Sequence, residues 1–544
     1  MNSIHARSRR LATLLAAGGF LLLAGNRVHA QPADRKACAV DSTRMDIIDV
    51  ADHWMTRVRI GQLAGEASVS SMAIRRPSLE RAAGACAHTR TGPTVAIATL
   101  PLRLRTTYNS AYPVNVNNGV LWAGRGIGFA MSGGGEIRLG PVSAAVYPVV
   151  AYQGNRAFEL KNVGMSDRSP FAYAGSRGID WPQRHGAGDF MTLDPGQSYV
   201  RVEGYGATIG VSTENLWLGP AQRMPLIMGS SAPGFPHVFL GTTRSLDVRI
   251  GSLEALAFWG RLMESDYFDA EPDNDRTLIA GLSAVFEPAF ARGLFVGVNR
   301  MYLADMEGGD LTRYFIDPYI DVRDNPIGDN QLFSLFARWV LPRSGFEVYA
   351  EWAREDHWGD WIDLLREPDH SQAYMLGFQK IGRWGDARLR WYGELAHLTA
   401  STTLRSGRGV VSFYTHSEVV QGYTNRGQLL GAWMGPGSDG QVLGVERMTP
   451  RRTTGLMLER VRFDADAYYN QWAPYYGQNG HDVSIGAAIR HVEQVGPVSI
   501  HAGLGAARRH NRSFVYLEGQ QPPDFRAETN VQLDIDLRWT PRIE

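Results

Sequence analysis

Two short clusters in the sequence combine acidic, histidine and serine residues, which are residue types that hydrolytic enzymes use. The clusters are Asp369, His370 and Ser371, and Glu355, Asp356 and His357. A serine hydrolase needs a nucleophile, a base and an orienting acid that converge from different parts of the chain, together with an oxyanion hole. Because neighbours on a strand point to opposite faces, three consecutive residues cannot form a triad by themselves. Neither cluster therefore predicts a hydrolase.

Two carboxylates could instead cleave a glycosidic bond, if they lay about 5 to 9.5 Å apart on either side of it. Glu203 and Glu214 are candidates by residue type, but the sequence does not give the distance between them. A chain that lines an interior with charged residues contains such pairs by chance. We expect no enzyme, no catalytic residue and no cofactor.

The segment STENLWLGP carries residue types that bind sugars. Glu214 and Asn215 can hydrogen-bond hydroxyl groups, Trp217 can stack on a pyranose ring, and Arg223, just beyond it, can pair with an acidic sugar. The alternative is structural, because the Trp and the following Gly-Pro pair could fix a bend between a strand and a loop, with Glu214 and Arg223 paired. Glu214, Asn215, Trp217 and Arg223 are the candidate carbohydrate-binding residues.

The elements that must position these residues follow a targeting segment. Residues 1–30 carry arginines at positions 7, 9 and 10, an apolar run from Leu11 to Ala24, and small residues before a cleavage point at Ala30. The run is too short for a bilayer-spanning helix, which needs about 20 apolar residues. Residues 1–30 therefore predict a signal peptide and an exported protein, with a retained anchor as the alternative.

The two cysteines, Cys38 and Cys86, both lie near the start of the exported chain. In an oxidising compartment an isolated pair is most simply one disulfide, and two unrelated buried thiols are the alternative. A metal site would need more ligands than the nearby His53 and His88 supply, so we expect no metal.

Between the cysteines, the apolar residues follow the helical period. One face after the N-cap residue Thr43 is formed by Ile47, Ile48, Ala51, Trp54, Met55 and Val58. A second short helix is expected to begin at Pro77. Residues 31–93 therefore predict a small helical region that the disulfide closes.

From residue 94 to residue 544 the period changes to two. Apolar and polar residues alternate in four segments, whose apolar members are Val531, Leu533, Ile535, Leu537 and Trp539; Leu389, Trp391 and Leu395; Val483, Ile485 and Ile489; and Leu100, Leu102 and Leu104, opposite Arg103 and Arg105. Strand after strand places charged residues on one face and apolar residues on the other. In a membrane barrel the charged face lines the lumen and the apolar face meets lipid.

An exported chain with about 450 residues of this pattern predicts an all-β transmembrane barrel. At roughly 25 residues for each strand and its connection, the chain would form about 18 antiparallel strands, an even number as in bacterial barrels. The 55 basic and 55 acidic residues balance and form no basic stripe, which excludes nucleic acid as the expected partner.

Five segments resemble the Wzi capsule-assembly family of outer-membrane proteins, in the same order along the chain. They are residues 109–128 (NSAYPVNVNNGVLWAGRGIG), 180–202 (DWPQRHGAGDFMTLDPGQSYVRV), 210–241 (GVSTENLWLGPAQRMPLIMGSSAPGFPHVFLG), 351–379 (EWAREDHWGDWIDLLREPDHSQAYMLGFQ) and 413–438 (FYTHSEVVQGYTNRGQLLGAWMGPGS). Two features depart from the family pattern. The chain continues past Trp539, and Leu218 stands where the family favours a second Trp.

The resemblance implies an 18-stranded barrel in the outer membrane of a Gram-negative cell, with a helical region on its periplasmic side and extracellular loops that largely close it. It also implies a lectin-like protein that binds exported capsular polysaccharide, or a related exopolysaccharide, and helps to assemble or anchor the capsule. Its expected partners are the polysaccharide and outer-membrane lipid, and a monomer is expected. The alternative from another class is a porin-like channel or transporter for small saccharides, which would share the barrel but keep its lumen open.

Overall fold

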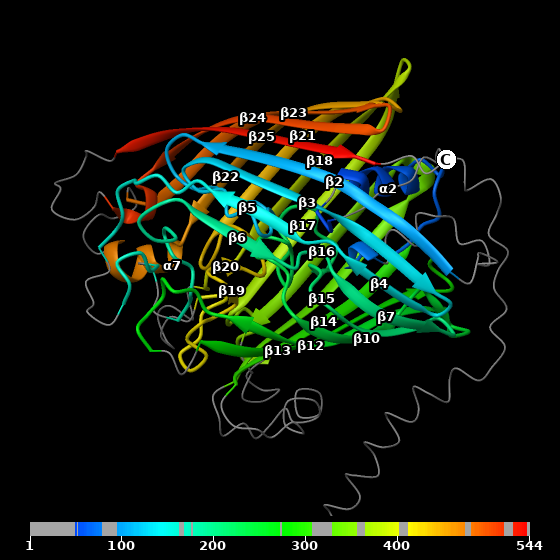
Figure 1. Ribbon diagram of the computed structural model, residues 1–544, viewed down its shortest axis with the longest axis horizontal. Helices are drawn as coiled ribbons and strands as arrows, with labels where there is room; N and C mark the ends of the chain where they lie inside the picture. Colours follow the sequence, from blue (N-terminus) through cyan, green and yellow to red (C-terminus); the bar gives the residue numbers. More distant parts are fainter. Residues whose placement is uncertain are drawn as a thin grey trace, which may run out of the picture.

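The strands close into one antiparallel barrel, in which the last strand lies beside the first (Figure 1). This computed structural model describes residues 49–51, 53–78, 95–162, 168–173, 175, 178–271, 275–306, 329–355, 365–401, 412–473, 480–515 and 526–540. Among these residues, no helix is long and apolar enough to cross a membrane.

The wall follows the chain order almost without exception. Its strands are β2 (Val95–Asn109), β3 (Gly126–Leu139), β4 (Val142–Val146), β5 (Val149–Gln153), β6 (Phe190–Asp194), β7 (Tyr199–Gly204), β8 (Ala207–Ser212), β10 (His237–Thr242), β11 (Leu246–Asp247), β12 (Gly251–Met263), β13 (Arg276–Pro288), β14 (Leu294–Asp305), β15 (Asn330–Leu341), β16 (Phe346–Glu355), β17 (Gln372–Trp384), β18 (Ala387–His397), β21 (Asp439–Met448), β22 (Arg452–Phe463), β23 (Asp482–Val495), β24 (Val498–His510) and β25 (Ala527–Trp539).

Three pairs of these strands continue one another along the wall: β4 with β5, β6 with β7, and β10 with β11. Within the described residues, the 21 wall strands therefore cross the barrel 18 times. The predicted barrel of about 18 antiparallel strands is confirmed, and the helical region predicted ahead of it stays a prediction.

Apolar side chains point outward from the wall, as the alternation predicts. On β25, Val531 and Trp539 are 40% and 48% exposed, whereas Asn530 and Arg538, each one residue earlier in the strand, are 0% and 4% exposed. This arrangement is the reverse of a soluble barrel and leaves an apolar band for lipid.

The predicted outward face of β2 is wrong at Leu100. The register between β2 and β3 shifts between Leu100 and Arg103, where Pro101 cannot donate a ladder hydrogen bond. The extra residue turns Leu100 into the barrel, where it packs in a buried cluster with Ala145, Tyr147 and Tyr199. Outward alternation resumes at Leu102, which is 38% exposed.

The two ends of the barrel differ in the length of their connections. At one end, here called the short-turn end, the connections are brief, such as the 3-10 helix η4 (Pro342–Ser344) and the pair Gly385–Asp386. At the other, long-loop end, the connections are long, such as residues 398–438 between β18 and β21. In bacterial barrels the short turns face the periplasm.

Helix α2 (His53–Leu63) and strand β1 (Ile74–Arg75) bring the N-terminal segment into the short-turn end. The α2 side chain of Arg57 donates to the carbonyl of Pro450, in the turn between β21 and β22. Strand β1 pairs with β9 (Trp217–Leu218), which belongs to the inward-folded connection after β8.

The helix predicted from Thr43 is thus described only in part. Of its predicted apolar face, Ala51 is exposed in a turn ahead of α2, Met55 is buried within α2, and Ile47 and Ile48 lie outside the described residues. The second predicted helix lies outside them beyond Ser78, as do Cys38 and Cys86. The boundaries 1–30, 31–93 and 94–544 stay predictions.

Inward-folded connections fill part of the lumen. The connection between β8 and β10, and the connection that carries β19 (Thr424–Asn425) and β20 (Gln428–Leu429), form one buried apolar cluster with strands of the wall. Its members include Leu226, Ile227, Phe258, Met301, Tyr414 and Leu430. Three short helical elements, α7 (Ala465–Ala467), the π-helix η6 (Tyr468–Trp472) and η7 (Arg512–Phe514), lie on long-loop connections.

Candidate functional site

Glu214 and Asn215 hold segments of the interior together. The Glu214 carboxylate is 0% exposed and accepts hydrogen bonds from the backbone N–H and the hydroxyl of Ser78, at 2.8 and 2.9 Å. The Asn215 amide donates to the carbonyl of Ala232 at 3.0 Å and accepts from Gln197 at 2.8 Å. Both side chains are therefore occupied within the protein.

Trp217 is enclosed in the same way. Its ring is 0% exposed, and its indole N–H donates to the carbonyl of Ala221 at 3.1 Å. The Arg75 guanidinium lies 4.6 Å from the ring centre and also donates to the carbonyl of Ala221. Because β1 and β9 place Arg75 opposite Trp217, this contact joins the N-terminal segment to the inward connection.

Arg223 differs from these three because its side chain lines an internal cavity. It forms a two-point ion pair with Glu459 of β22, at 2.5 and 2.9 Å, so the sequence-level alternative of a pair with Glu214 is wrong. Burial lowers the pKa of Arg223, but Glu459, Tyr392 and Glu394 together raise it by more, so the net pKa lies above its ordinary value.

The described side chains of the hydrolase-like clusters contact other groups of the wall. The Ser371 hydroxyl donates to the backbone carbonyl of Glu355, and His370 lies 3.3 Å from the guanidinium of Arg354. Asp356 and His357 lie outside the described residues. Glu203 pairs with Arg201 at 2.9 Å.

The two candidate glycosidase carboxylates, Glu203 and Glu214, lie at opposite ends of β8. Glu203 stands opposite Thr208, near the start of that strand, whereas Glu214 follows its end. Six extended residues span about 20 Å, beyond the separation that glycoside cleavage uses. Within the part of the chain that the structure describes, no group of three His, Cys, Asp or Glu side chains could hold a metal ion.

The cavity has a volume of about 490 Å³ and lies beside the apolar cluster, with which it shares residues such as Leu429 and Val442. Strands β2, β18 and β21 to β25 supply most of its wall, and α2 bounds it through His53. The wall has space because its inward positions carry small residues, namely Gly486, Ala488, Gly503, Gly505 and Ala507. The volume falls in the range of small-molecule sites.

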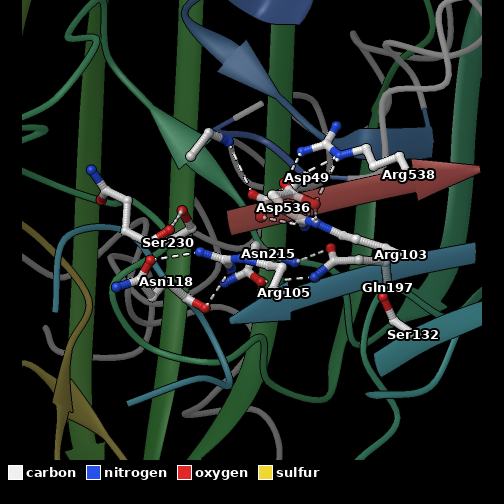
Figure 2. Close-up of polar contacts among 12 residues, drawn as sticks. Asp49, Arg103, Arg105, Asn118, Ser132, Gln197, Asn215, Ser230, Asp536 and Arg538 are labelled. Carbon is white, nitrogen blue, oxygen red and sulfur yellow. Dashed lines mark hydrogen bonds and ion pairs between the residues drawn. The ribbon is translucent and has the colours of Figure 1, made fainter. Parts of the chain in front are cut away.

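Charged side chains dominate the cavity lining. Among the described residues, it includes eight arginines and six acidic residues, an excess of positive charge. Near the seam between β2 and β25, Arg103 donates to Asp536 at 2.8 Å and to Asp49 at 3.1 Å, and Arg538 contacts the same Asp536 at 2.7 Å (Figure 2). This cluster fixes the N-terminal segment against the closing strands.

Nearly all of the other charged lining groups are paired as well. Arg105 reaches Asn118 at 2.6 Å (Figure 2), Arg390 pairs with Glu446 at 2.8 Å, and Arg509 contacts Asp482 at 2.6 Å. A strand carboxylate can also hold a loop, since Glu394 accepts from the backbone N–H groups of residues 222, 223 and 224 at 2.8, 3.0 and 2.5 Å. Arg490 and Asp534 differ from these groups, because neither forms a hydrogen bond or ion pair to a described residue, although each acts electrostatically on the other.

The family model of the capsule assembly protein Wzi matches residues 127–490, more than half of the 544-residue chain. The chain belongs to the Wzi family. The Wzi match covers four of the five segments that carry the resemblance in sequence completely. Of the first segment, residues 109–128, it covers only the last two residues. With its apolar outer wall, this Wzi-family barrel is an outer-membrane protein. No curated protein matches the chain.

Three solved structures of other proteins are similar to this chain to different degrees. Wzi of Escherichia coli, described as an outer-membrane, carbohydrate-binding β-barrel involved in group 1 capsule assembly, has a TM-score of 0.55 at 14% sequence identity, over 92% of this chain and 98% of that one. OccAB2 of Acinetobacter baumannii has a TM-score of 0.41 at 11% identity, over 82% and 98%. OccK2 of Pseudomonas aeruginosa, solved with glucuronate, has a TM-score of 0.40 at 11% identity, over 82% and 98%.

At the long-loop end of this Wzi-family barrel, buried carboxyl groups anchor the inward connections. Asp180 accepts from the backbone N–H and hydroxyl of Ser265 at 2.7 and 2.6 Å, and burial raises its pKa to about 7. Asp464 accepts from the N–H of Ala467 at 3.0 Å and from the Tyr173 hydroxyl, and burial raises its pKa to about 7. These carboxyl groups bind loops and lie outside the membrane-spanning strands.

Arg490, Gly503 and Asp534 were missed by the sequence analysis, although two of them lie in segments whose alternation it identified. The strand pattern places Arg490 and Asp534 on the polar face of their strands. It does not show that β23, β24 and β25 are neighbours in a register that brings the two into one row. The local sequence therefore indicates their orientation but not their proximity.

Proposed function

We propose that this protein binds exported capsular polysaccharide at the cell surface and helps to assemble or anchor the capsule there. The observation that carries the proposal is membership of the Wzi family over residues 127–490. Wzi of Escherichia coli, which shares the fold, is described as carbohydrate-binding and involved in capsule assembly. The mixture of arginine, carboxylate, amide and aromatic groups in the cavity is chemically suited to an acidic sugar.

A porin-like channel is the rival function, and the packing of the lumen argues against it. The apolar cluster fills part of the described lumen, and α2 contacts the turn between β21 and β22 at the short-turn end. A channel would need a continuous path of water past both. We therefore expect reconstituted protein to show no porin-like conductance in planar bilayers.

Of the four candidate carbohydrate contacts, the geometry supports Arg223, whose side chain reaches the cavity. Contact at Glu214, Asn215 and Trp217 stays a prediction, and it would need these buried side chains to leave their present partners. We assign the protein a binding role and no catalytic one.

Capsule retention tests the proposed function directly. Cells that lack the protein should release capsular polysaccharide into the medium, and the full chain supplied in trans should restore cell-bound capsule, both measured by flow cytometry and by assay of the culture supernatant. Purified protein should also retain the cell's own polysaccharide in a pull-down and leave an uncharged glucan in solution. Equal retention of capsule with and without the protein would refute the proposal.

The processing of the N-terminal region is part of the same proposal. Cleavage after Ala30 would place Gln31 at the mature N-terminus, which Edman or mass-spectrometric sequencing of the outer-membrane protein should show. Light scattering of the detergent-solubilised protein should give the mass of one chain.

A further inference from the structure

We infer that the cavity holds a subsite for a single carboxylated sugar unit, formed by Arg490 and Asp534 on either side of Gly503. The inference names a ligand class for the cavity, and it stands whether or not the protein retains capsule. It follows from the register of three wall strands, from the pairing of the charged lining groups and from the space above one glycine.

The three residues lie in one row across the wall. Arg490 of β23 stands opposite Gly503 of β24, which in turn stands opposite Asp534 of β25. Two strand spacings separate the backbones of Arg490 and Asp534 by about 10 Å. All three residues line the cavity, so the row presents a cation and an anion with an unfilled position between them.

The position between the two charged residues, above Gly503, is open space. A Cβ atom added to Gly503 would have Asp534 as its nearest neighbour, with Cβ at 3.7 Å and Oδ2 at 3.9 Å, which are ordinary contact distances. The neighbouring row supplies Gly505 and Ala488, which add little bulk, and Gln532, which offers an amide. A flat ring can therefore lie against the wall at Gly503.

Pairing separates Arg490 and Asp534 from the rest of the lining. The twelve other arginine and acidic side chains that line the cavity each form a hydrogen bond or ion pair with another described residue: Arg103, Arg105, Arg223, Arg390, Arg509, Arg512, Arg538, Asp49, Glu394, Glu446, Glu459 and Asp536. Arg490 and Asp534 form neither with any described residue, although both line the same cavity. Two charged groups are thus left facing free space.

The chemistry of the row selects the ligand. A guanidinium binds a carboxylate through two parallel hydrogen bonds, which fits Arg490 to the acid group of a sugar. The Asp534 carboxylate and the Gln532 amide can accept hydrogen bonds from hydroxyl groups on the far side of the ring. Arg105, Arg490 and Arg223 all act electrostatically on Asp534. Because arginines outnumber acidic residues in the lining, the region as a whole favours a ligand of net negative charge.

Isothermal titration of the purified full chain with glucuronate, and with glucose as a neutral control, tests this subsite. The Arg490→Gln variant removes the charge and keeps an amide, and Arg447→Gln at an exposed ion pair outside the cavity is its matched control. The Gly503→Leu variant fills the space above residue 503 without removing a charge. Gly382→Leu is the matched control, because a Cβ there would meet nothing within 4 Å.

We expect wild-type protein and both control variants to bind glucuronate in preference to glucose. Loss of one charge-assisted hydrogen-bonded contact should weaken glucuronate binding by roughly 10- to 100-fold in Arg490→Gln. Gly503→Leu should abolish it by steric exclusion. Unchanged heat-modifiable migration on gels would show that both variants fold. Wild-type protein that binds no glucuronate, or folded Arg490→Gln and Gly503→Leu variants that bind it as wild type does, would overturn the inference.

A competition arm identifies the source of the sugar unit. If intact capsular polysaccharide displaces glucuronate, the subsite takes part of the polymer; if only acid-hydrolysed fragments displace it, the subsite takes a small free acid. Both outcomes support the subsite. Since the readout is binding of a small probe to purified protein, its failure is distinct from a failure of capsule retention in cells.

Discussion

Replacement of Trp217 by alanine separates a role in the fold from a role in sugar contact. The Trp217 ring is fully buried, receives the Arg75 guanidinium at 4.6 Å and donates its N–H to the carbonyl of Ala221. We expect Trp217→Ala to loosen the inward connection from residue 213 to residue 224 and the N-terminal segment that pairs with it. If Trp217 serves the fold alone, polysaccharide bound per folded molecule should not change; if it also contacts sugar, binding per folded molecule should fall.

The magnitude follows from the contacts that are lost. Truncation of a buried tryptophan to alanine costs about 3 to 5 kcal/mol. Arg75 still donates to the carbonyl of Ala221, so no buried acceptor loses its last partner, and the cost should lie near the middle of that range. A loss of about 4 kcal/mol raises the population of the locally opened state roughly a thousandfold, while the wall strands stay paired.

Hydrogen exchange read out by mass spectrometry measures this effect peptide by peptide. Peptides that cover residues 71–78 and 213–224 should exchange much faster in Trp217→Ala, and peptides of β22 to β25 should be unchanged. Trp391→Ala is the matched control, since Trp391 is 53% exposed on the outer wall. The reasoning is refuted if protection of both segments is unchanged while polysaccharide binding falls, because Trp217 would then act as a sugar contact.

Three further predictions follow from the buried charges and the cysteines. Glu347→Ala should lower the free energy of unfolding by about 3 to 5 kcal/mol in thermal unfolding, because it leaves the buried Arg59 and Arg338 without their shared carboxylate. The same variant should loosen α2 and raise single-channel conductance above that of wild type. Burial raises the pKa of Asp180 and of Asp464 from 3.8 to about 7, so between these pH values the folded protein binds more protons than the unfolded chain. The free energy of unfolding should therefore fall as pH rises from 3.8 to about 7, and it should fall less steeply in Asp180→Asn. A Cys38–Cys86 disulfide should stabilise the N-terminal region by about 4 kcal/mol, and unreduced peptide mapping that finds two free thiols would exclude it.

The barrel could be predicted from the sequence because its cause is local. A strand that separates lipid from a polar lumen must alternate, and Val531 to Trp539 do so without interruption. The exception, Leu100, has an equally local cause in Pro101, yet the position of a bulge depends on the partner strand, so alternation alone could not reveal the shift.

The candidate site was harder to predict because its members are brought together by the closed register. Glu214, Asn215 and Trp217 carry residue types that bind sugars, and the same hydrogen-bonding and stacking capacity is used to hold the inward connections. A sequence does not show whether a polar side chain will be satisfied by a ligand or by the chain itself. Arg223 illustrates both, since it pairs with Glu459 and also lines the cavity.

The charges on the inner face of the wall therefore hold the inward connections, whereas in a porin they would line a water-filled channel. Glu394 holds three successive backbone N–H groups of an inward connection, and Glu347 holds Arg59 of α2. Such carboxylates and arginines satisfy the polar backbone and side chains of loops that could not otherwise be buried in the lumen. Charged residues on the lumenal face are thus as consistent with a lumen filled by loops as with a conducting channel. A ligand site is indicated by charged groups to which the inward connections and the wall give no hydrogen bond or ion pair. In the described lining of the cavity, these groups are Arg490 and Asp534.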